Sequence, residues 1–163
     1  MEIPVKVLVL CTGNSCRSII AEGLINALGE GRFVASSAGS QPTGEVHPGA
    51  LEALARHGVA VGRPRSKSWE DPDIPEPDLV ITVCDSAAGE TCPVWLASIP
   101  RVHWSIPDPA GATGSDAEVR AIFDQCYQRL RRRIEALAAL DPESLNPEEL
   151  HARAQAIHDA EDG

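Results

Sequence analysis

Residues 5–28 read VKVLVLCTGNSCRSIIAEGLINAL, and this stretch indicates the fold class of the chain. Its first six residues are apolar apart from one lysine, which is typical of a strand buried on both faces of a parallel sheet. After the polar loop, Ile20, Leu24 and Leu28 recur every four positions and Gly29 follows, which predicts a helix. A buried strand, a short loop and a helix therefore follow one another directly.

Strands and helices continue to alternate along the chain. Ser115 and Glu118 have the spacing of a capping box and predict the start of a long helix. Further elements are predicted as strands over residues 33–36, 79–83 and 101–104 and a helix over residues 47–57. This alternation predicts one doubly wound α/β domain over residues 1–140, with its ligand beyond the carboxyl ends of the strands.

Residues 141–163 are predicted to form a helical tail that begins with a linker. The apolar stripe of this tail is narrow, so we expect the tail to pack on the domain, pair with another chain or fray. His151 and His158 are expected to lie in solvent.

The bulk composition argues against several partners. The 163 residues carry a formal net charge of −10, whereas nucleic acids and anionic membranes bind basic surfaces. No stretch approaches the ~18 apolar residues of a membrane span, and the N-terminus lacks the basic start of a signal peptide. We therefore expect a cytoplasmic protein, and a monomer. Thiols stay mostly reduced in the cytoplasm, so the five cysteines indicate metal or redox chemistry before structural disulfides.

The loop between the first strand and helix has the composition of an oxyanion site. Its small residues let several backbone N–H groups converge on one point, at the positive end of a helix. Arg17 adds a planar fork of donors that suits two oxygens of a phosphate-like group. The predicted binding residues are Thr12, Gly13, Asn14, Ser15, Cys16, Arg17 and Ser18.

Cys11 at the start of this loop is the predicted nucleophile. The same donors are expected to lower the pKa of its thiol below the ordinary value of ~8.5, and Ser18 offers a further hydrogen bond to the sulfur. Asn14 is expected to hold the shape of the loop, since Asn tolerates strained turns. Cys16 is either a packing residue or the partner of Cys11 in a reversible disulfide. The alternative reading is a buried structural cysteine with a surface arginine.

Asp108 is the predicted general acid. It follows the fourth predicted strand, so it belongs to the same edge of the sheet as Cys11, and the proline after it stiffens its loop. Such a carboxyl group could protonate the oxygen that departs when a thiolate attacks. An ordinary turn aspartate is the alternative, because Asp-Pro is common in loops.

Several motifs together resemble the low-molecular-weight protein tyrosine phosphatase superfamily, and within it the arsenate reductases of that fold. They are CTGNSCRS (residues 11–18), SSAGS (36–40), VHPGA (46–50), VITVCDSAAGETCPVW (80–95) and DPAG (108–111). The resemblance implies a four-stranded parallel sheet flanked by helices, with Cys11 as nucleophile, Arg17 as oxyanion ligand and Asp108 as acid. It further implies that Cys84 and Cys92 form a redox pair reduced by thioredoxin, with glutaredoxin or another small thiol as the alternative donor.

The chain departs from that pattern at two places. Seven residues separate Cys84 from Cys92, one more than in the thioredoxin-coupled members. Those members bind potassium through Asn, Glu, Ser and Asp side chains, of which Asn14, Glu22 and Ser37 match three, whereas Lys67 stands at the aspartate position. An ammonium group can replace the ion there, so we predict neither a metal nor an organic cofactor.

Three thiols suit arsenate reduction. A second thiolate that attacks the sulfur of a Cys11–arsenic(V) adduct releases arsenite and forms a Cys11–Cys84 disulfide, which Cys92 then converts into Cys84–Cys92 for reduction by an external dithiol. A helical path between Cys84 and Cys92 would separate their Cα atoms by ~12 Å, whereas a disulfide needs roughly 4.4–6.8 Å. The segment between them is therefore expected to be looped or to refold on oxidation.

Two other functions remain open. In a phosphatase acting on phosphate monoesters through a cysteinyl-phosphate, Cys84 and Cys92 would be only a redox brake. In a thiol-based arsenite binder or oxidation sensor, neither an acid nor an arginine would be needed. The alternative for Cys84 is a core cysteine and for Cys92 a surface thiol, and Cys126 is expected in the core.

Overall fold

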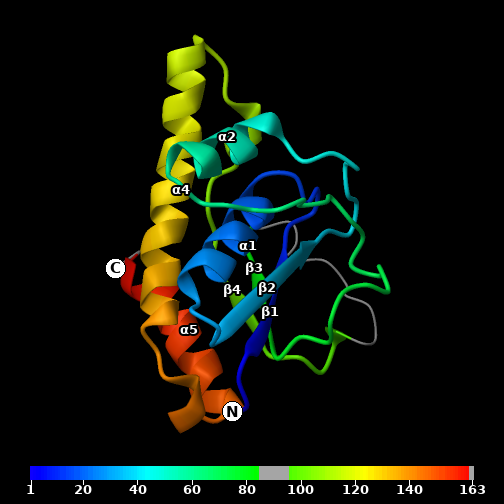
Figure 1. The fold of residues 1–163 in the computed structure, drawn as a ribbon, viewed down its shortest axis with the longest axis vertical. Helices are drawn as coiled ribbons and strands as arrows, with labels where there is room; N and C mark the ends of the chain where they lie inside the picture. Colours follow the sequence, from blue (N-terminus) through cyan, green and yellow to red (C-terminus); the bar gives the residue numbers. More distant parts are fainter. Residues whose placement is uncertain (85–95, 162–163) are drawn as a thin grey trace.

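A computed structural model describes residues 1–84 and 96–161, and these form a parallel four-stranded sheet covered by helices (Figure 1). The strands are β1 (Val5–Leu10), β2 (Phe33–Ala38), β3 (Leu79–Thr82) and β4 (Arg101–His103). The helices are α1 (Arg17–Leu28), α2 (Pro48–Arg56), α4 (Asp116–Ala138) and α5 (Pro147–Glu161), with short 3₁₀ helices η2 (Pro109–Gly111) and η3 (Pro142–Ser144). The predicted fold class is confirmed.

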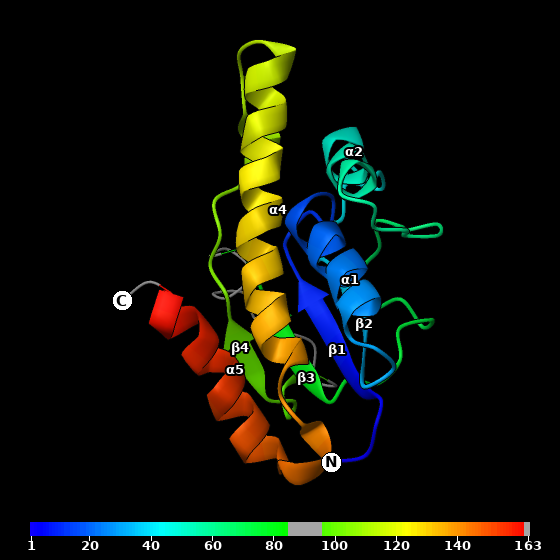
Figure 2. The same cartoon turned by 60° about the vertical axis from the view of Figure 1, so that its left-hand side comes forward.

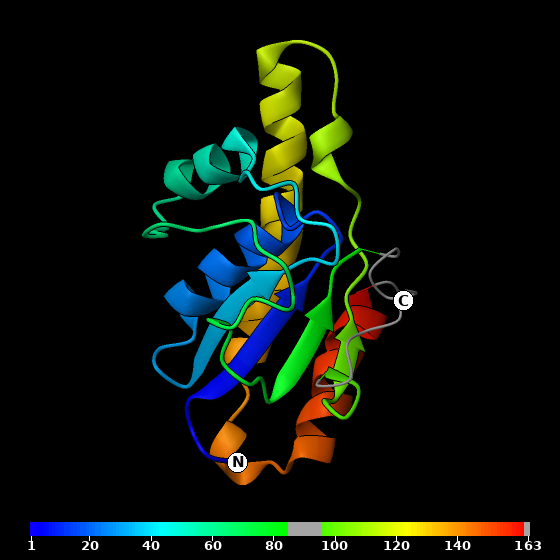
Figure 3. The same ribbon diagram turned by 90° about the vertical axis from the view of Figure 1, so that its right-hand side faces the viewer.

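The strands lie in the order β2-β1-β3-β4, as Figure 3 shows. All three pairings are parallel, so the carboxyl ends of the strands meet at one edge. β2 is two residues longer than the strand predicted over residues 33–36, because its pairing with β1 continues to Leu10 opposite Ala38. Cys11 and Cys84 follow β1 and β3, and Asp108 lies beyond β4, so the fold gathers them at that edge.

Both faces of the sheet are buried, as the apolar run in β1 predicts. Val5, Val7 and Val9 point into the main core, which α1, α2 and α4 cover. Leu8 and Leu10 point to the opposite face, into a smaller apolar cluster with Val80 and Leu96 and with partly buried Trp69, Ile74 and Ile99. Figure 2 shows α1 and α4 side by side in front of the sheet.

Local signals in the sequence set the bounds of the helices. The Ser115–Glu118 capping box is present with both of its hydrogen bonds, so α4 begins where predicted. α2 begins at Pro48, and the His47 ring accepts a hydrogen bond from the Gly49 N–H at 2.9 Å. At the end of α1, a Cβ on Gly29 would lie 2.3 Å from the Phe33 carbonyl oxygen, so this turn excludes larger residues. No helix within the described ranges is long and apolar enough to cross a membrane.

The helix of the tail, α5, packs against the free edge of β4 (Figure 2). The Gln155 carboxamide accepts a hydrogen bond from the His103 N–H at 3.0 Å and donates one to the His103 carbonyl at 3.1 Å. His151 Nε2 donates to the Arg101 carbonyl at 2.7 Å, and the buried Trp104 ring donates to the Ala154 carbonyl at 2.9 Å. The tail therefore packs on the domain instead of fraying.

The prediction that two histidines of the tail lie in solvent was wrong. His151 is partly buried at β4, and the His158 side chain is only 14% exposed, with its ring tilted against the His103 ring. The stripe of α5 that faces the sheet includes polar residues, because the open edge of β4 offers backbone groups that need partners.

Candidate active site

The loop from Cys11 to Ser18 turns tightly between β1 and α1, and Asn14 holds its shape. Asn14 is fully buried and has a positive φ of 46°, which confirms the predicted strained turn. Its carboxamide donates to the hydroxyl groups of Ser18 at 2.8 Å and Ser37 at 3.0 Å, and accepts the Lys67 N–H at 2.9 Å. One side chain therefore ties the loop to β2 and to the segment around Lys67.

That segment, residues 66–68, supports the loop from behind. The Ser66 hydroxyl donates to the Gly13 carbonyl at 3.2 Å, and the Lys67 carbonyl accepts the Gly39 N–H at 2.9 Å. A Cβ at Gly39 would lie 2.3 Å from the Thr12 carbonyl oxygen, so only glycine permits this close approach. Sequence analysis grouped Lys67 with Asn14 through the resemblance. The contacts of Ser66 and Gly39 were not predicted, because they join residues far apart in the chain.

Arg17 and Asp108 meet at the mouth of the loop, as their predicted roles require. The Arg17 guanidinium lies 3.5 Å from the Asp108 carboxylate and donates a hydrogen bond to the Ile106 carbonyl at 3.0 Å. Asp108 caps η2 by accepting the Ala110 N–H at 2.9 Å, which fixes the direction of its carboxylate. The Asp108 side chain is 51% exposed, so solvent and ligand can reach it.

Arg17 still has capacity for a ligand. Its Nε atom is buried and has no hydrogen-bond partner within the described part of the chain. A buried guanidinium N–H without a partner is costly, and an oxyanion in the loop would supply the missing acceptor.

Cys11 and Cys84 lie next to each other, although 72 positions separate the loop from Cys84. The side chains of Cys11 and Cys84 share a hydrogen bond, and both residues are buried. The Thr12 N–H donates to the Cys84 sulfur at 3.3 Å, and the Thr12 hydroxyl lies 3.7 Å from it. A donor aimed at this sulfur favours negative charge on it, so Thr12 serves Cys84 as well as the loop.

The expected lowering of the Cys11 pKa is not found. The hydrogen bond with Cys84 and the burial of the thiol raise the pKa of Cys11 well above its ordinary value, and the nearby Arg17 lowers it only in part. Two adjacent sulfurs share protons, so removing the second proton is harder than removing the first. The expectation counted the donors of the loop and left out the effect of the Cys84 thiol on the Cys11 pKa.

The other described cysteines are buried near the same end. Burial raises the pKa of Cys16 to about 11 and that of Cys126 to about 12. Cys126 belongs to the core, as predicted, but it also lines a hollow of ≈ 370 Å³ beside Asp108. Cys92 lies outside the described residues, so its predicted pairing with Cys84 remains a prediction.

The residues behind the loop do not fit a bound metal cation. Among residues 1–84 and 96–161, no group of three His, Cys, Asp or Glu side chains could hold a metal ion. The oxygen of the Asn14 carboxamide accepts the Lys67 N–H, and the Lys67 ammonium supplies positive charge to the Glu22 carboxylate.

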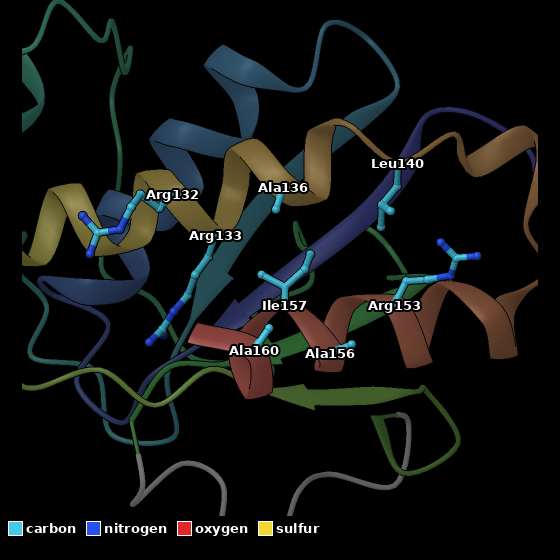
Figure 4. A pocket seen from close by; sticks show the side chains of 8 residues that line it. All are labelled: Arg132, Arg133, Ala136, Leu140, Arg153, Ala156, Ile157 and Ala160. Carbon is cyan, nitrogen blue, oxygen red and sulfur yellow. The ribbon is translucent and has the colours of Figure 1, made fainter. Parts of the chain in front are cut away.

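A second hollow lies between α4 and α5, apart from these residues (Figure 4). It has a volume of ≈ 550 Å³, with Ile157 at its centre and arginines at both ends. None of the predicted site residues lines it.

Comparisons with known proteins point to one family. A family model described as low molecular weight phosphotyrosine protein phosphatase matches residues 6–152. The chain is 36% identical over 129 residues to an arsenate reductase of Halalkalibacterium halodurans, covering 79% of this chain and 91% of that protein.

Solved structures give the same grouping. A structure described as an arsenate reductase in the phosphate binding state superposes with a TM-score of 0.67 at 29% identity, covering 83% of this chain and 97% of that one. The thioredoxin-dependent arsenate reductase of Corynebacterium glutamicum superposes with a TM-score of 0.58 at 29% identity, covering 80% of this chain and 61% of that one. The chain therefore belongs to the low molecular weight phosphotyrosine protein phosphatase family.

Proposed function

We propose that this protein reduces arsenate to arsenite with Cys11, Cys84 and Cys92 as a relay of thiols. The observation that carries the proposal is the hydrogen bond between Cys11 and Cys84 behind a loop built for an oxyanion. A phosphatase needs only water for its second step, whereas a reductase needs a second sulfur within reach of the first. The arsenate reductases among the relatives support this choice.

The first step joins arsenic to Cys11. The loop N–H groups and Arg17 hold a tetrahedral oxyanion, and the Cys11 thiolate attacks its central atom. One oxygen leaves as water after Asp108, 3.5 Å from Arg17, donates a proton to it. Arsenic remains in the +5 state in the resulting Cys11–arsenic adduct.

The raised pKa of Cys11 makes the approach of the substrate part of this step. In the anion-free protein, Cys11 shares a proton with Cys84. Passing this proton to the incoming oxyanion leaves a thiolate at Cys11 with Arg17 nearby. Protonation of the substrate and ionisation of the nucleophile are then one exchange.

The second step transfers the electrons. Cys84 gives its proton to an oxygen on arsenic, attacks the Cys11 sulfur and forms a Cys11–Cys84 disulfide. The sulfur–arsenic bond breaks and its electron pair stays on arsenic, which leaves as arsenite in the +3 state. The two thiols are oxidised by two electrons and arsenic is reduced by two. The Thr12 N–H holds the Cys84 sulfur in place for this attack.

The third step regenerates the loop. Cys92 attacks Cys84, which frees Cys11 and leaves a Cys84–Cys92 disulfide. Thiol–disulfide exchange with an external dithiol then returns both residues to thiols. The thioredoxin-dependent relative from Corynebacterium glutamicum favours thioredoxin as this donor.

The decisive assay gives the purified protein arsenate with thioredoxin, thioredoxin reductase and NADPH. Consumption of NADPH that depends on arsenate is expected, and Cys84→Ser and Cys92→Ser are each expected to abolish multiple turnovers. Cys92→Ser should still release one arsenite per protein in a single turnover, because Cys84 alone completes the second step. The matched control is Cys126→Ser, a buried cysteine outside the relay.

The phosphatase reading is tested in the same preparation with p-nitrophenyl phosphate. Sustained hydrolysis of this ester without arsenate-dependent NADPH consumption, unchanged in Cys84→Ser, would overturn the reductase proposal. Replacing thioredoxin by glutaredoxin with glutathione identifies the donor.

A further inference from the structure

A partly buried carboxylate belongs to the hydrogen-bond network behind the oxyanion loop. Glu22 lies on α1, five positions after Arg17, and burial raises the pKa of its side chain. Hydrogen bonds from the backbone and the hydroxyl group of Ser37 lower the pKa of Glu22 and so oppose the effect of burial. The Ser37 hydroxyl also accepts a hydrogen bond from the Asn14 carboxamide. The Glu22 carboxylate therefore belongs to the hydrogen-bond network that shapes the loop.

A negative charge in this position opposes the function of the site. The loop has to attract a multiply charged oxyanion, and a partly buried carboxylate repels it through a medium that screens less than bulk water. The charge therefore needs a compensating cation close to it.

Lys67 supplies that cation. Its backbone is held on both sides, because its N–H donates to Asn14 at 2.9 Å and its carbonyl accepts the Gly39 N–H at 2.9 Å. Its side chain is partly buried, and its ammonium favours the charged form of Glu22. The chain has only one other lysine, Lys6, which is exposed on β1.

We propose that Lys67 is a positioning residue whose ammonium is the permanent counter-charge of Glu22, so that the oxyanion loop reaches its binding geometry without a dissolved monovalent cation. Lys67 acts through Asn14 and Ser37 and does not touch the ligand. For the reaction, this inference rests on the proposed arsenate chemistry, but oxyanion binding tests it separately.

Lysine and a bound cation are interchangeable at this place on physical grounds. A carboxylate at position 67 would face Glu22 together with the oxygens of Asn14 and Ser37. Carboxylate, carboxamide and hydroxyl oxygens are the ligands that hard cations take. Lys67→Asp is therefore expected to turn a cation-independent loop into a cation-dependent one.

The experiment measures the Kd of inorganic phosphate by isothermal titration calorimetry in potassium chloride and in choline chloride at one ionic strength. The wild-type protein should give the same Kd in both salts. Lys67→Asp should raise Kd about tenfold in choline chloride, which corresponds to about 1.4 kcal/mol. Potassium should restore most of the loss, and should raise the melting temperature of this variant but not that of the wild type.

Two further variants separate charge at this place from general effects. Lys67→Arg keeps the cation and should bind phosphate as the wild type does in both salts. Lys6→Asp makes the same change in net charge at an exposed residue of β1 and should leave Kd and its salt response unchanged.

Either of two results overturns the proposal. One is a wild-type protein whose phosphate Kd falls severalfold when potassium replaces choline. The other is a folded Lys67→Asp variant that matches the wild type in choline chloride. If the phosphate results are as expected but arsenate is not reduced, the role of Lys67 stands and the proposed function fails.

Discussion

Two regions of this small sheet differ in how completely their polar groups are hydrogen-bonded. At the free edge of β4, side chains of α5 supply partners to the backbone of Arg101 and His103, and the backbone carbonyl of Ala154 accepts the Trp104 ring N–H. At the carboxyl ends of the strands, the Arg17 Nε atom is buried without an acceptor and two sulfurs share a hydrogen bond.

The difference teaches where to look for function. A region whose donors and acceptors match each other stabilises the fold, and a region with a donor left over is prepared for a ligand. Changes at the β4 edge should therefore lower stability and leave the chemistry intact, and changes at the loop should do the reverse.

The strongest test at the β4 edge is Trp104→Ala. Trp104 is fully buried between the sheet and α5, so its loss should lower the free energy of unfolding by about 3–5 kcal/mol. Urea denaturation measures this change. Trp104→Phe keeps most of the packing and loses only the hydrogen bond to Ala154, so it should cost far less. Equal losses in the two variants would contradict the role given to packing.

The matching test at the loop is Arg17→Lys. A lysine keeps the charge but not the fork that reaches the oxyanion and the Ile106 carbonyl together, so arsenate-dependent kcat/KM should fall by about 10²–10³-fold. Stopped-flow or coupled assays measure this loss, and the denaturation midpoint should stay close to that of the wild type. Activity within a few-fold of the wild type would remove Arg17 from oxyanion binding.

A smaller effect is expected for Gln155→Ala at the β4 edge. This change leaves the N–H and carbonyl of His103 without the carboxamide that now bonds to both, which should cost about 1–3 kcal/mol. Thermal denaturation measures the loss, and phosphate binding serves as the control that should not change. A variant with unaltered stability would show that water replaces the carboxamide at no cost.

The smallest effect concerns the proton shared by Cys11 and Cys84. Because the hydrogen bond with Cys84 is the largest cause of the raised Cys11 pKa, Cys84→Ala should lower that pKa. The thiolate fraction at pH 7–8 then rises, and alkylation of Cys11 by iodoacetamide should become severalfold faster.

Mass spectrometry of the Cys11 peptide measures this rate across pH. In the wild type, the rate should still be rising above pH 9, since a raised pKa places the ionisation beyond the ordinary range. A wild-type profile that levels off below pH 7 would contradict the shared proton.

Sequence reasoning predicted the strand–loop–helix unit well, because its signals are local. Spacing marked α1, the capping box marked the start of α4, and the apolar run of β1 required cover on both faces. It failed where distant residues decide the environment. The pKa of Cys11 was expected to lie below its ordinary value, but it lies above it. The histidines of α5 were expected to lie in solvent, but His151 donates a hydrogen bond to β4.

The amino-acid sequence alone determined which residues have the chemistry: a cysteine and an arginine on one short loop, an acid after a later strand, and further thiols. These residues can be recognised from sequence because chemical reactivity depends on the residue type and because the residues of a loop are neighbours in the chain. The resemblance implied that Cys84 reacts with Cys11 and that Lys67 stands at a cation position. Only the tertiary structure set the contacts themselves, with Cys84 beside Cys11, Arg17 beside Asp108 and the Lys67 N–H on Asn14. Parallel pairing of β1 with β3 and the close approach of residues 66–68 set these contacts, and neither can be read from local sequence, because each depends on the packing of the whole chain.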